Sequence, residues 1–158
     1  MLATLFETKS SYSLTFIRVV LGFVFFAHGC QKMLGWYGGA GFSNTMRFFT
    51  GAGIPAVFAF LAICAEFFGG LGLLLGFLGR IAAFGVMTNM VVAIATRHWQ
   101  FGLFMNWGGQ QQGEGFEFHL LAIAICLAIL IGGSGAFSLD WLICRGMGGR
   151  KPASSRQQ

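Results

Sequence analysis

Charged side chains are scarce in this sequence, and their scarcity excludes a water-soluble protein. Only 9% of the 158 residues are charged, whereas soluble domains carry about 25%. Because the chain is 56% hydrophobic, its polar residues cannot cover a water-facing surface. The length allows one domain, and apolar runs fill most of it. The sequence therefore predicts an all-α integral membrane protein.

Motifs for bound cofactors are also missing. The cysteines never form C-x-x-C, which argues against a zinc site, a disulfide framework and thiol oxidation like that of other four-helix quinone-linked proteins. The sequence holds no haem-attachment C-x-x-C-H, no dinucleotide fingerprint and no flavin signature. The spacing of His28 and His119 gives no support to haem ligation. We therefore expect no metal and no covalently bound cofactor.

The net charge of +5 does not indicate a nucleic-acid partner. The basic residues are scattered, and no folded aqueous domain is present to hold nucleic acid. Basic residues that flank apolar helices usually set membrane topology instead. We therefore expect the lipid bilayer as partner.

Four apolar runs match the roughly 20 residues that one bilayer crossing needs. We expect transmembrane helices at about 12–34, 55–78, 81–98 and 116–133, packed as a four-transmembrane-helix bundle in one domain of residues 1–145. No small-residue cleavage site follows the first run, so we interpret it as a retained helix and not a signal peptide. No C-terminal lipidation motif is present. The basic tail, 146–158, is expected to be disordered and cytoplasmic.

The connections between these runs differ in character. The segment 35–53 is rich in glycine and aromatic residues, and we expect an interfacial amphipathic helix over 43–50, with Arg47 toward water. The polar, glycine-rich segment 100–115 is typical of an outer loop. After the last run, Ser138 is placed to cap a short helix that begins at Leu139, with Trp141 as an interfacial anchor.

Lysine and arginine positions predict the orientation of the bundle. Lys9, Arg80 and Arg145 lie near span ends on one side, whereas Arg47 lies on the other. The positive-inside rule then places both termini in the cytoplasm, as an even number of spans requires. We expect a multi-pass protein of a bacterial inner (plasma) membrane.

Glu66 stands alone in the uncharged run 55–79. An ionisable residue at membrane depth is costly unless it has a partner, and it marks a candidate site. A rise of about 1.5 Å per residue puts Glu66 roughly 16 Å below the outer boundary, between His28 at about 9 Å and Arg18 at about 24 Å. Asn89 comes out at about 14 Å by the same count. We expect Glu66 to lie within reach of His28 or Arg18.

Helical phase and depth extend this candidate site. At about 100° per residue, one stripe of the first helix holds Arg18 and Lys32, with His28 on its shoulder, and should face the bundle interior. Nearer the outer boundary, five residues converge from three spans: Lys32, Arg97, His98, Glu117 and His119. They form either a polar vestibule that leads to Glu66 or a set of ordinary interfacial charges. Arg18 and Glu66 likewise form either a structural ion pair or a site that binds a polar head or moves protons.

Glycines offer one further pattern. Gly72 and Gly76 form a G-x-x-x-G pair, which allows two helix backbones to approach closely. The pair packs either a neighbouring helix or a second copy of the chain, which would make the protein a homo-oligomer.

Several short motifs, in this order and spacing, resemble the DoxX family of small four-helix membrane proteins. They cover 14–142 and comprise Arg18, Leu21-Gly22, Phe25, His28-Gly29 and Lys32, then Gly51-Ala52-Gly53-Ile54-Pro55, Ala65-Glu66, Gly69-Gly70, Leu73, Leu75-Gly76 and Arg80, and finally Gly133-Ser134-Gly135 with Ser138-Leu139-Asp140. The resemblance implies a four-helix bundle that is described as oxidoreductase-like or associated with quinol oxidase.

Two functions follow as hypotheses. The first is a quinone/quinol-linked oxidoreductase subunit, in which Glu66 exchanges protons while Arg18, His28, Lys32, Asn89 and His119 bind the ligand. A quinone or a redox partner protein, soluble or membrane-bound, would then carry the electrons. The second is a non-enzymatic assembly protein, or a protein that binds or transports a small solute and recruits redox partners. Fold and function separate readily, so the resemblance does not choose between them.

Overall fold

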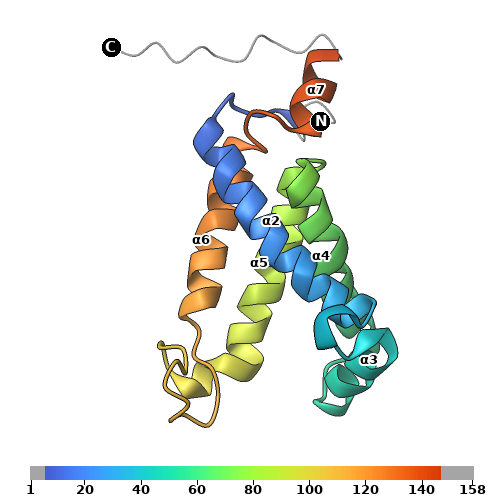
Figure 1. The fold of residues 1–158 in the computed structure, drawn as a ribbon, viewed down its shortest axis with the longest axis vertical. Helices are drawn as coiled ribbons and strands as arrows, with labels where there is room; N and C mark the ends of the chain where they lie inside the picture. The colour runs from blue at the N-terminus through green and yellow to red at the C-terminus, as the bar shows by residue number, and fades with distance from the viewer. Residues whose placement is uncertain (1–5, 147–158) are drawn as a thin grey trace.

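The computed structural model describes residues 6–146, and all regular secondary structure in that range is helical. Four helices run along the long axis (Figure 1). They are α2 (Tyr12–Met33), α4 (Ala56–Leu75), α5 (Gly79–Ala93), which continues into the π-helical turn η2 (Ile94–His98) and the 3-10 turn η3 (Trp99–Phe101), and α6 (Glu117–Gly132). Shorter helices are η1 (Trp36–Gly38), α3 (Gly41–Gly51) and α7 (Leu139–Gly146). The predicted helical membrane bundle is confirmed.

Three of the helices are long and apolar enough to cross a membrane: Tyr12–Met33, Ala56–Leu75 and Gly79–Phe101. The fourth run forms a shorter helix than expected, because α6 has 16 residues and spans about 24 Å at 1.5 Å per residue. Large apolar side chains project outward from all four helices. Phe16 is 71% exposed, Phe58 63%, Phe84 59% and Leu121 66%. Such a surface is suited to lipid and not to water.

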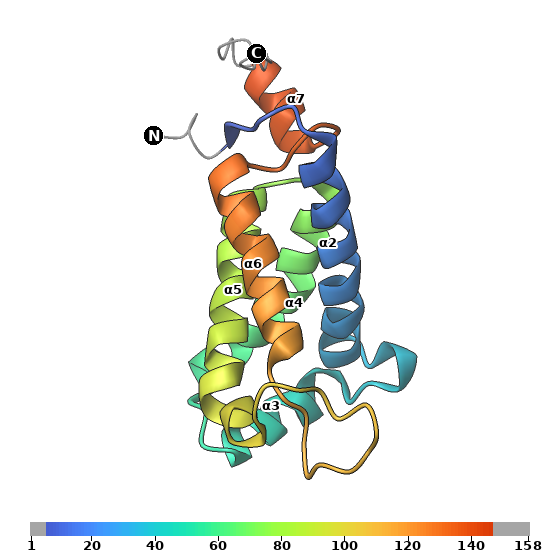
Figure 2. The ribbon, with the colours of Figure 1, turned by 90° about the vertical axis from the view of Figure 1, so that its left-hand side faces the viewer.

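The two ends of the bundle are built differently (Figures 1 and 2). At one end, called here the α3 end, lie α3 and the loop 102–116. At the other, the α7 end, lie the start of α2, the turn between α4 and α5, and α7. An amphipathic helix forms at α3, where an interfacial helix over 43–50 was expected. At the α7 end, the Ser138 hydroxyl accepts a hydrogen bond from Trp141 N at 3.2 Å and caps α7. Of the predicted tail 146–158, residues 147–158 lie outside the described residues.

Glycines allow α2 and α4 to pack backbone against backbone. A Cβ atom at Gly22 would lie 2.6 Å from Leu74 N, and one at Gly29 would lie 2.8 Å from the Glu66 carbonyl carbon. A Cβ at Gly70 would meet the backbone of Phe26. Real carbon atoms do not approach so closely, so only glycine fits at these positions. The contact fixes how α2 and α4 are aligned along their length.

The G-x-x-x-G pair packs within the chain. A Cβ at Gly72 would lie 3.0 Å from Phe77 O, and one at Gly76 would lie 2.9 Å from Ser138 Cα. Gly76 also has a φ of 64° and ends α4 in the left-handed conformation that favours glycine. The structure therefore supports the neighbouring-element alternative for these two glycines.

Side-chain hydrogen bonds close the α7 end. The Asp140 carboxylate accepts from Leu78 N at 2.7 Å and Gly79 N at 2.9 Å, where α5 begins, and from Ser134 Oγ at 2.5 Å. A negative charge at a helix N-terminus is favourable, because the free N–H groups there carry partial positive charge. Asp140 is 1% exposed, so it acts as a buried cap that ties α7 to α5.

Arginines cap two helix C-termini at the same end. Arg80 donates to the carbonyls of Leu130 and Ile131, the last turn of α6. Arg18, which is 1% exposed, donates to the carbonyls of Leu73 and Leu74 at the end of α4. The last carbonyls of a helix carry partial negative charge, so a cation near them is favourable. The α7 end is thus held by charged side chains that replace water as partners of the helix ends.

Replacing Gly29 with alanine should destabilise the bundle, because the added methyl group meets the backbone of α4. Forced overpacking of this kind costs about 1–3 kcal/mol. The matched control is Gly85→Ala on α5, where the new Cβ finds only Ala65 Cβ at 3.6 Å. Thermal unfolding in mild detergent should show a lower Tm for Gly29→Ala and an unchanged or raised Tm for Gly85→Ala. Equal Tm values for the two variants would contradict the close α2–α4 contact.

Candidate functional site

Glu66 lies at the meeting point of three helices. It projects from α4 and is 4% exposed. Both of its carboxylate oxygens accept from Lys32 Nζ of α2, with the Oε2 contact at 2.5 Å. Oε1 also accepts from Asn89 Nδ2 of α5 at 2.8 Å. The structure therefore brings three of the predicted site residues together: Lys32, Glu66 and Asn89.

The Lys32–Glu66 ion pair is unequally buried. The Lys32 side chain is 30% exposed, whereas that of Glu66 is 5% exposed. A lysine stem can lie along apolar surface while its ammonium group reaches a polar partner. Lys32 is therefore the more accessible partner of the pair.

A groove adjoins Lys32 at the α3 end. Its volume is about 280 Å³, and it lies between the end of α2 and the helix α3. Its lining is mostly apolar or small and consists of Gln31, Lys32, Gly39, Ala40, Thr45, Phe48 and Phe49. Arg97 on η2 reaches the same place, since its guanidinium carbon lies 5.8 Å from the centre of the Phe48 ring. The groove is thus lined in part by Lys32, the residue that pairs with Glu66.

His119 lies at the start of α6 and faces the bundle interior. It is 7% exposed, and its ring centre lies 4.1 Å from that of His98 on η2. Among residues 6–146, nothing donates to or accepts from its Nδ1 atom. Glu117, two residues earlier in the chain, accepts from Met105 N at 3.0 Å and Trp107 Nε1 at 3.1 Å. The expected vestibule residues therefore gather at the α3 end, although no hydrogen bond links His119 to Glu66.

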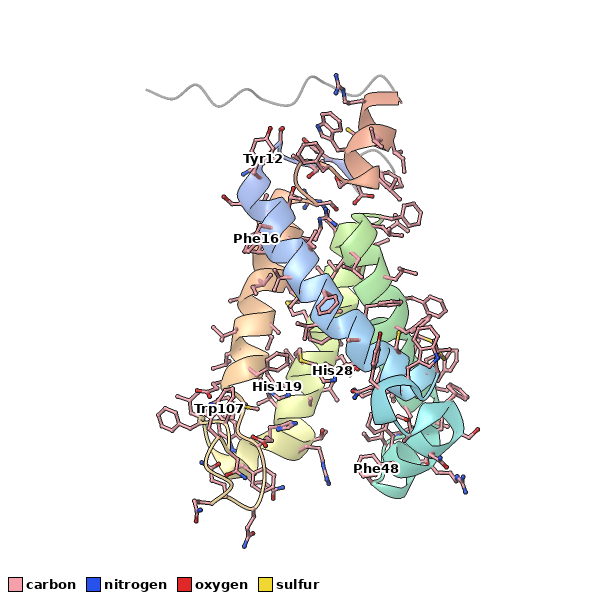
Figure 3. All side chains as sticks on the ribbon, viewed as in Figure 1. Tyr12, Phe16, His28, Phe48, Trp107 and His119 are labelled. Atoms are coloured by element: carbon pink, nitrogen blue, oxygen red, sulfur yellow. The ribbon has the colours of Figure 1, made fainter. Side chains whose placement is uncertain are left out.

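His28 does not approach Glu66. Its side chain is exposed, and its Nδ1 lies 3.2 Å from Gln31 Oε1. Figure 3 shows it on α2 at a height similar to that of His119 on α6. The expected depth of His28 was reasonable, but the expected direction of its side chain was wrong. Gly29 faces α4, and the residue before it is turned by about 100° around the helix, away from that contact.

Arg18 does not pair with Glu66 either. It donates to the carbonyls of Ser134 at 2.7 Å, Leu74 at 2.9 Å and Phe137 at 3.3 Å, and also to that of Leu73. Arg18 precedes Lys32 by 14 residues, which is about 21 Å along α2. The expected Arg18–Glu66 contact is wrong because free carbonyls gather around Arg18 at the α7 end, while the long side chain of Lys32 reaches Glu66.

Sequence reasoning missed the groove lining on α3. Thr45 is 6% exposed, and Phe48 and Phe49 flank the groove. The available signal was the apolar face of the interfacial helix, which was identified without its partner on α2. Cys126 of α6 belongs to the apolar core with Met90 and Ala122. Within the described range, no three histidine, cysteine or acidic side chains are grouped to hold a metal ion.

Removing Lys32 should destabilise the protein, because the buried Glu66 carboxylate would lose its cation. Breaking one partner of a buried pair costs about 3–5 kcal/mol, and we expect about 2–4 for Lys32→Met because its side chain is partly exposed. In the double variant Lys32→Met/Glu66→Gln no charge is left unpaired, so most of the lost stability should return. Chemical or thermal unfolding of the four proteins in detergent measures this cycle. Additive losses in the double variant would contradict a direct pair.

Arg18→Gln should destabilise the α7 end and leave the Lys32–Glu66 contact intact. Each carbonyl left buried without a donor costs about 1–3 kcal/mol, so the total loss should reach at least about 3 kcal/mol. The effect should add to that of Lys32→Met, because residues this far apart do not share partners. Unfolding of the single and double variants tests this expectation, and a coupling above about 0.5 kcal/mol would show that the two ends act together.

Comparison with known proteins agrees with this architecture. The chain is 28% identical over 130 residues to "Putative oxidoreductase CatD" of Bacillus subtilis (strain 168), which covers 82% of this chain and 86% of that protein. No solved structure matches the chain. The sequence profile of the DoxX family matches residues 13–99, more than half of the chain, from the start of α2 to the end of η2. The protein therefore belongs to the DoxX family.

Proposed function

We propose that this protein is a quinone/quinol-linked oxidoreductase subunit whose buried Glu66 exchanges protons with the bound head group. The observation that carries the proposal is the position of Glu66: a buried carboxylate held by Asn89 and by Lys32, and Lys32 also lines an apolar groove. The name of the relative from Bacillus subtilis, which describes an oxidoreductase, supports redox chemistry in general. Membership of the DoxX family supports the same class of protein.

The residues at this site fit a quinone head group. A bound quinone supplies two carbonyl oxygens that accept hydrogen bonds and a ring that takes up two electrons and two protons. Lys32 Nζ and Asn89 Nδ2 are donors for such carbonyls, and the Glu66 carboxylate is an acceptor for the hydroxyl groups of the reduced form. Phe48 and Phe49 give the groove apolar walls, as small-molecule sites commonly have.

Each side chain then has a definite task. Glu66 holds or releases a proton at its carboxylate, while Lys32 and Asn89 orient that group. Lys32 reaches the groove, so its ammonium group binds the polar head and keeps it near Glu66. No redox-cofactor motif is present in the sequence, so a partner protein with its own redox cofactor supplies or receives the two electrons. We propose that this partner is a soluble or membrane-bound redox protein.

Charge distribution supports an orientation in the inner (plasma) membrane with both termini in the cytoplasm. Arg80 and Arg145 belong to the α7 end, together with Lys9 before α2, whereas Arg47 and Arg97 lie at the α3 end. The bias toward the α7 end favours a cytoplasmic location for that end. The groove and Glu66 would then open toward the outer leaflet, where a lipid-soluble quinone can diffuse laterally to the site.

A non-enzymatic role has one observation in its favour. The Lys32–Glu66–Asn89 contacts join α2, α4 and α5 without any ligand, as a structural network in an assembly or solute-binding protein would. The two functions differ in what accompanies the purified protein. Co-purified quinone or a redox enzyme favours the first, and a protein that emerges from mild detergent alone and ligand-free favours the second.

Glu66→Gln should weaken quinol binding more than quinone binding. Glutamine keeps the size of the side chain and loses the charged acceptor for the quinol hydroxyl, which should reduce quinol affinity about tenfold, or about 1.4 kcal/mol. Calorimetry in nanodiscs, with a short-chain quinone and its quinol in buffers of different ionisation enthalpy, measures both affinity and the number of protons exchanged. Proton exchange on binding should disappear in Glu66→Gln.

His28→Gln is the matched control, because His28 is exposed and lies away from Glu66. It should bind both ligands as the unmodified protein does. If Glu66→Gln changes neither the affinities nor the proton count, Glu66 has no role in ligand protonation. If the unmodified protein binds neither ligand, the quinone-linked function itself is wrong.

A further inference from the structure

His119 is a buried polar group whose hydrogen bonding is incomplete. It is 7% exposed, and its Nδ1 atom has no partner within the described part of the chain. Arg18, Asp140 and Glu66, which are also buried, each make several hydrogen bonds. Arg80 Nε and Trp141 Nε1 are two further buried atoms without a partner in the described part of the chain. Native proteins leave few buried polar atoms unpaired, and an exception calls for an explanation. Water or a transferable proton can supply the missing partner.

His98 lies beside the ring of His119 and contacts the loop 102–116. Its Nδ1 lies 2.8 Å from the carbonyl oxygen of Glu114. Since a carbonyl only accepts, Nδ1 of His98 carries the hydrogen and its Nε2 is left as the acceptor in the neutral ring. The two histidine rings lie 4.1 Å apart between centres. His98 is half-buried and His119 is buried, so His98 is the more accessible of the two rings.

The other charged groups near this pair are engaged elsewhere. Glu114 Oε2 accepts from Asn106 N at 2.7 Å, and Glu117 accepts from the backbone of Met105 and the indole of Trp107. These bonds hold the loop beside the start of α6. Arg97 lies over Phe48. The end of α2 that carries Lys32 also lies at the α3 end. Two contacting pairs of titratable groups, Glu66 with Lys32 and His119 with His98, therefore lie toward the same end of the bundle.

We propose that His119 and His98 form the route by which protons pass between the Lys32–Glu66 pair and the water at the α3 end. An imidazole can accept a proton at one ring nitrogen and release one from the other, so its charge is unchanged after one proton has moved. His119 takes the proton delivered by the Lys32–Glu66 pair and passes one to Nε2 of His98. His98 then releases its Nδ1 proton to water beside the loop as the hydrogen bond to the Glu114 carbonyl breaks. This route rests on the proposed function, because the quinone chemistry proposed for Glu66 is what requires proton transfer. The route carries only protons.

The route can be tested on the purified full-length chain in nanodiscs, without quinone or a redox partner. After a pH jump, time-resolved infrared spectroscopy follows the carboxyl band of Glu66, which is assigned by its loss in Glu66→Gln. His119→Gln keeps a polar side chain that does not titrate, and it should slow proton exchange at Glu66 at least about a hundredfold, the lower end of what one proton-transferring group contributes. His28→Gln, on the exposed side of α2, should exchange as the unmodified protein does.

A second variant and a rescue experiment separate proton transfer from structure. His98→Gln should slow the exchange in the same direction, and external imidazole should restore the rate in His119→Ala, where the vacated space admits it. If His119→Gln fails to fold, judged by its thermal unfolding, the His98→Gln rate decides. If His119→Gln folds and exchanges protons at Glu66 at the unmodified rate, the route is wrong. If His119→Gln does not fold, an unmodified rate in His98→Gln overturns the route.

Failure of the proton route and failure of the proposed function would give different experimental results. If the chain binds no quinone and His119→Gln still slows exchange at Glu66, the quinone-linked function fails and the proton route stands. If quinone binding depends on Glu66 while both histidine variants exchange normally, the quinone site stands and the route is wrong.

Discussion

An ionised side chain inside a membrane protein must find its partners within the protein, because hydrocarbon supplies none. This constraint accounts for the position of most buried charges in the structure. Glu66 is held by Lys32 and Asn89, and Asp140 is held by two backbone N–H groups and a hydroxyl. Arg18 is surrounded by carbonyls. The contacts that meet this requirement join helices at the α7 end and form a polar site nearer the α3 end.

The close contact between α2 and α4 decides which charges can meet. Gly22, Gly29 and Gly70 allow the backbones to touch and so fix the two helices lengthwise. With that alignment, Lys32 reaches Glu66 while Arg18 lies beside the end of α4. A wider separation would leave a buried carboxylate without its cation. The glycines are therefore part of the site although none of them carries a functional group.

Sequence reasoning predicted the helices well, because an apolar run of spanning length has few alternative structures in a bilayer. It also identified Glu66 as the buried carboxylate and placed Asn89 at its level. The residue that pairs with Glu66 was harder to predict. Depth counting treats each helix as vertical and each side chain as pointing inward, so it favoured Arg18 or His28 as the partner of Glu66 and placed Lys32 nearer the outer boundary. That choice depends on the α2–α4 contact and on the carbonyls near Ser134 and Phe137, which lie far from Arg18 in the sequence.

In the proposed function, Lys32 would make the site responsive to a ligand. Lys32 both lines the groove and supplies the ion pair of Glu66. A head group that takes a hydrogen bond from its ammonium group would compete with the carboxylate for the same three N–H donors. Ligand binding would then alter the free energy of holding a negative charge on Glu66, and by linkage the protonation of Glu66 would alter ligand affinity by the same factor. Asn89, which contacts the carboxylate from α5, would keep the group in place while its charge changes. The proposed exchange of protons with a ligand requires such reciprocity, whereas a purely structural ion pair does not require its lysine to be partly exposed.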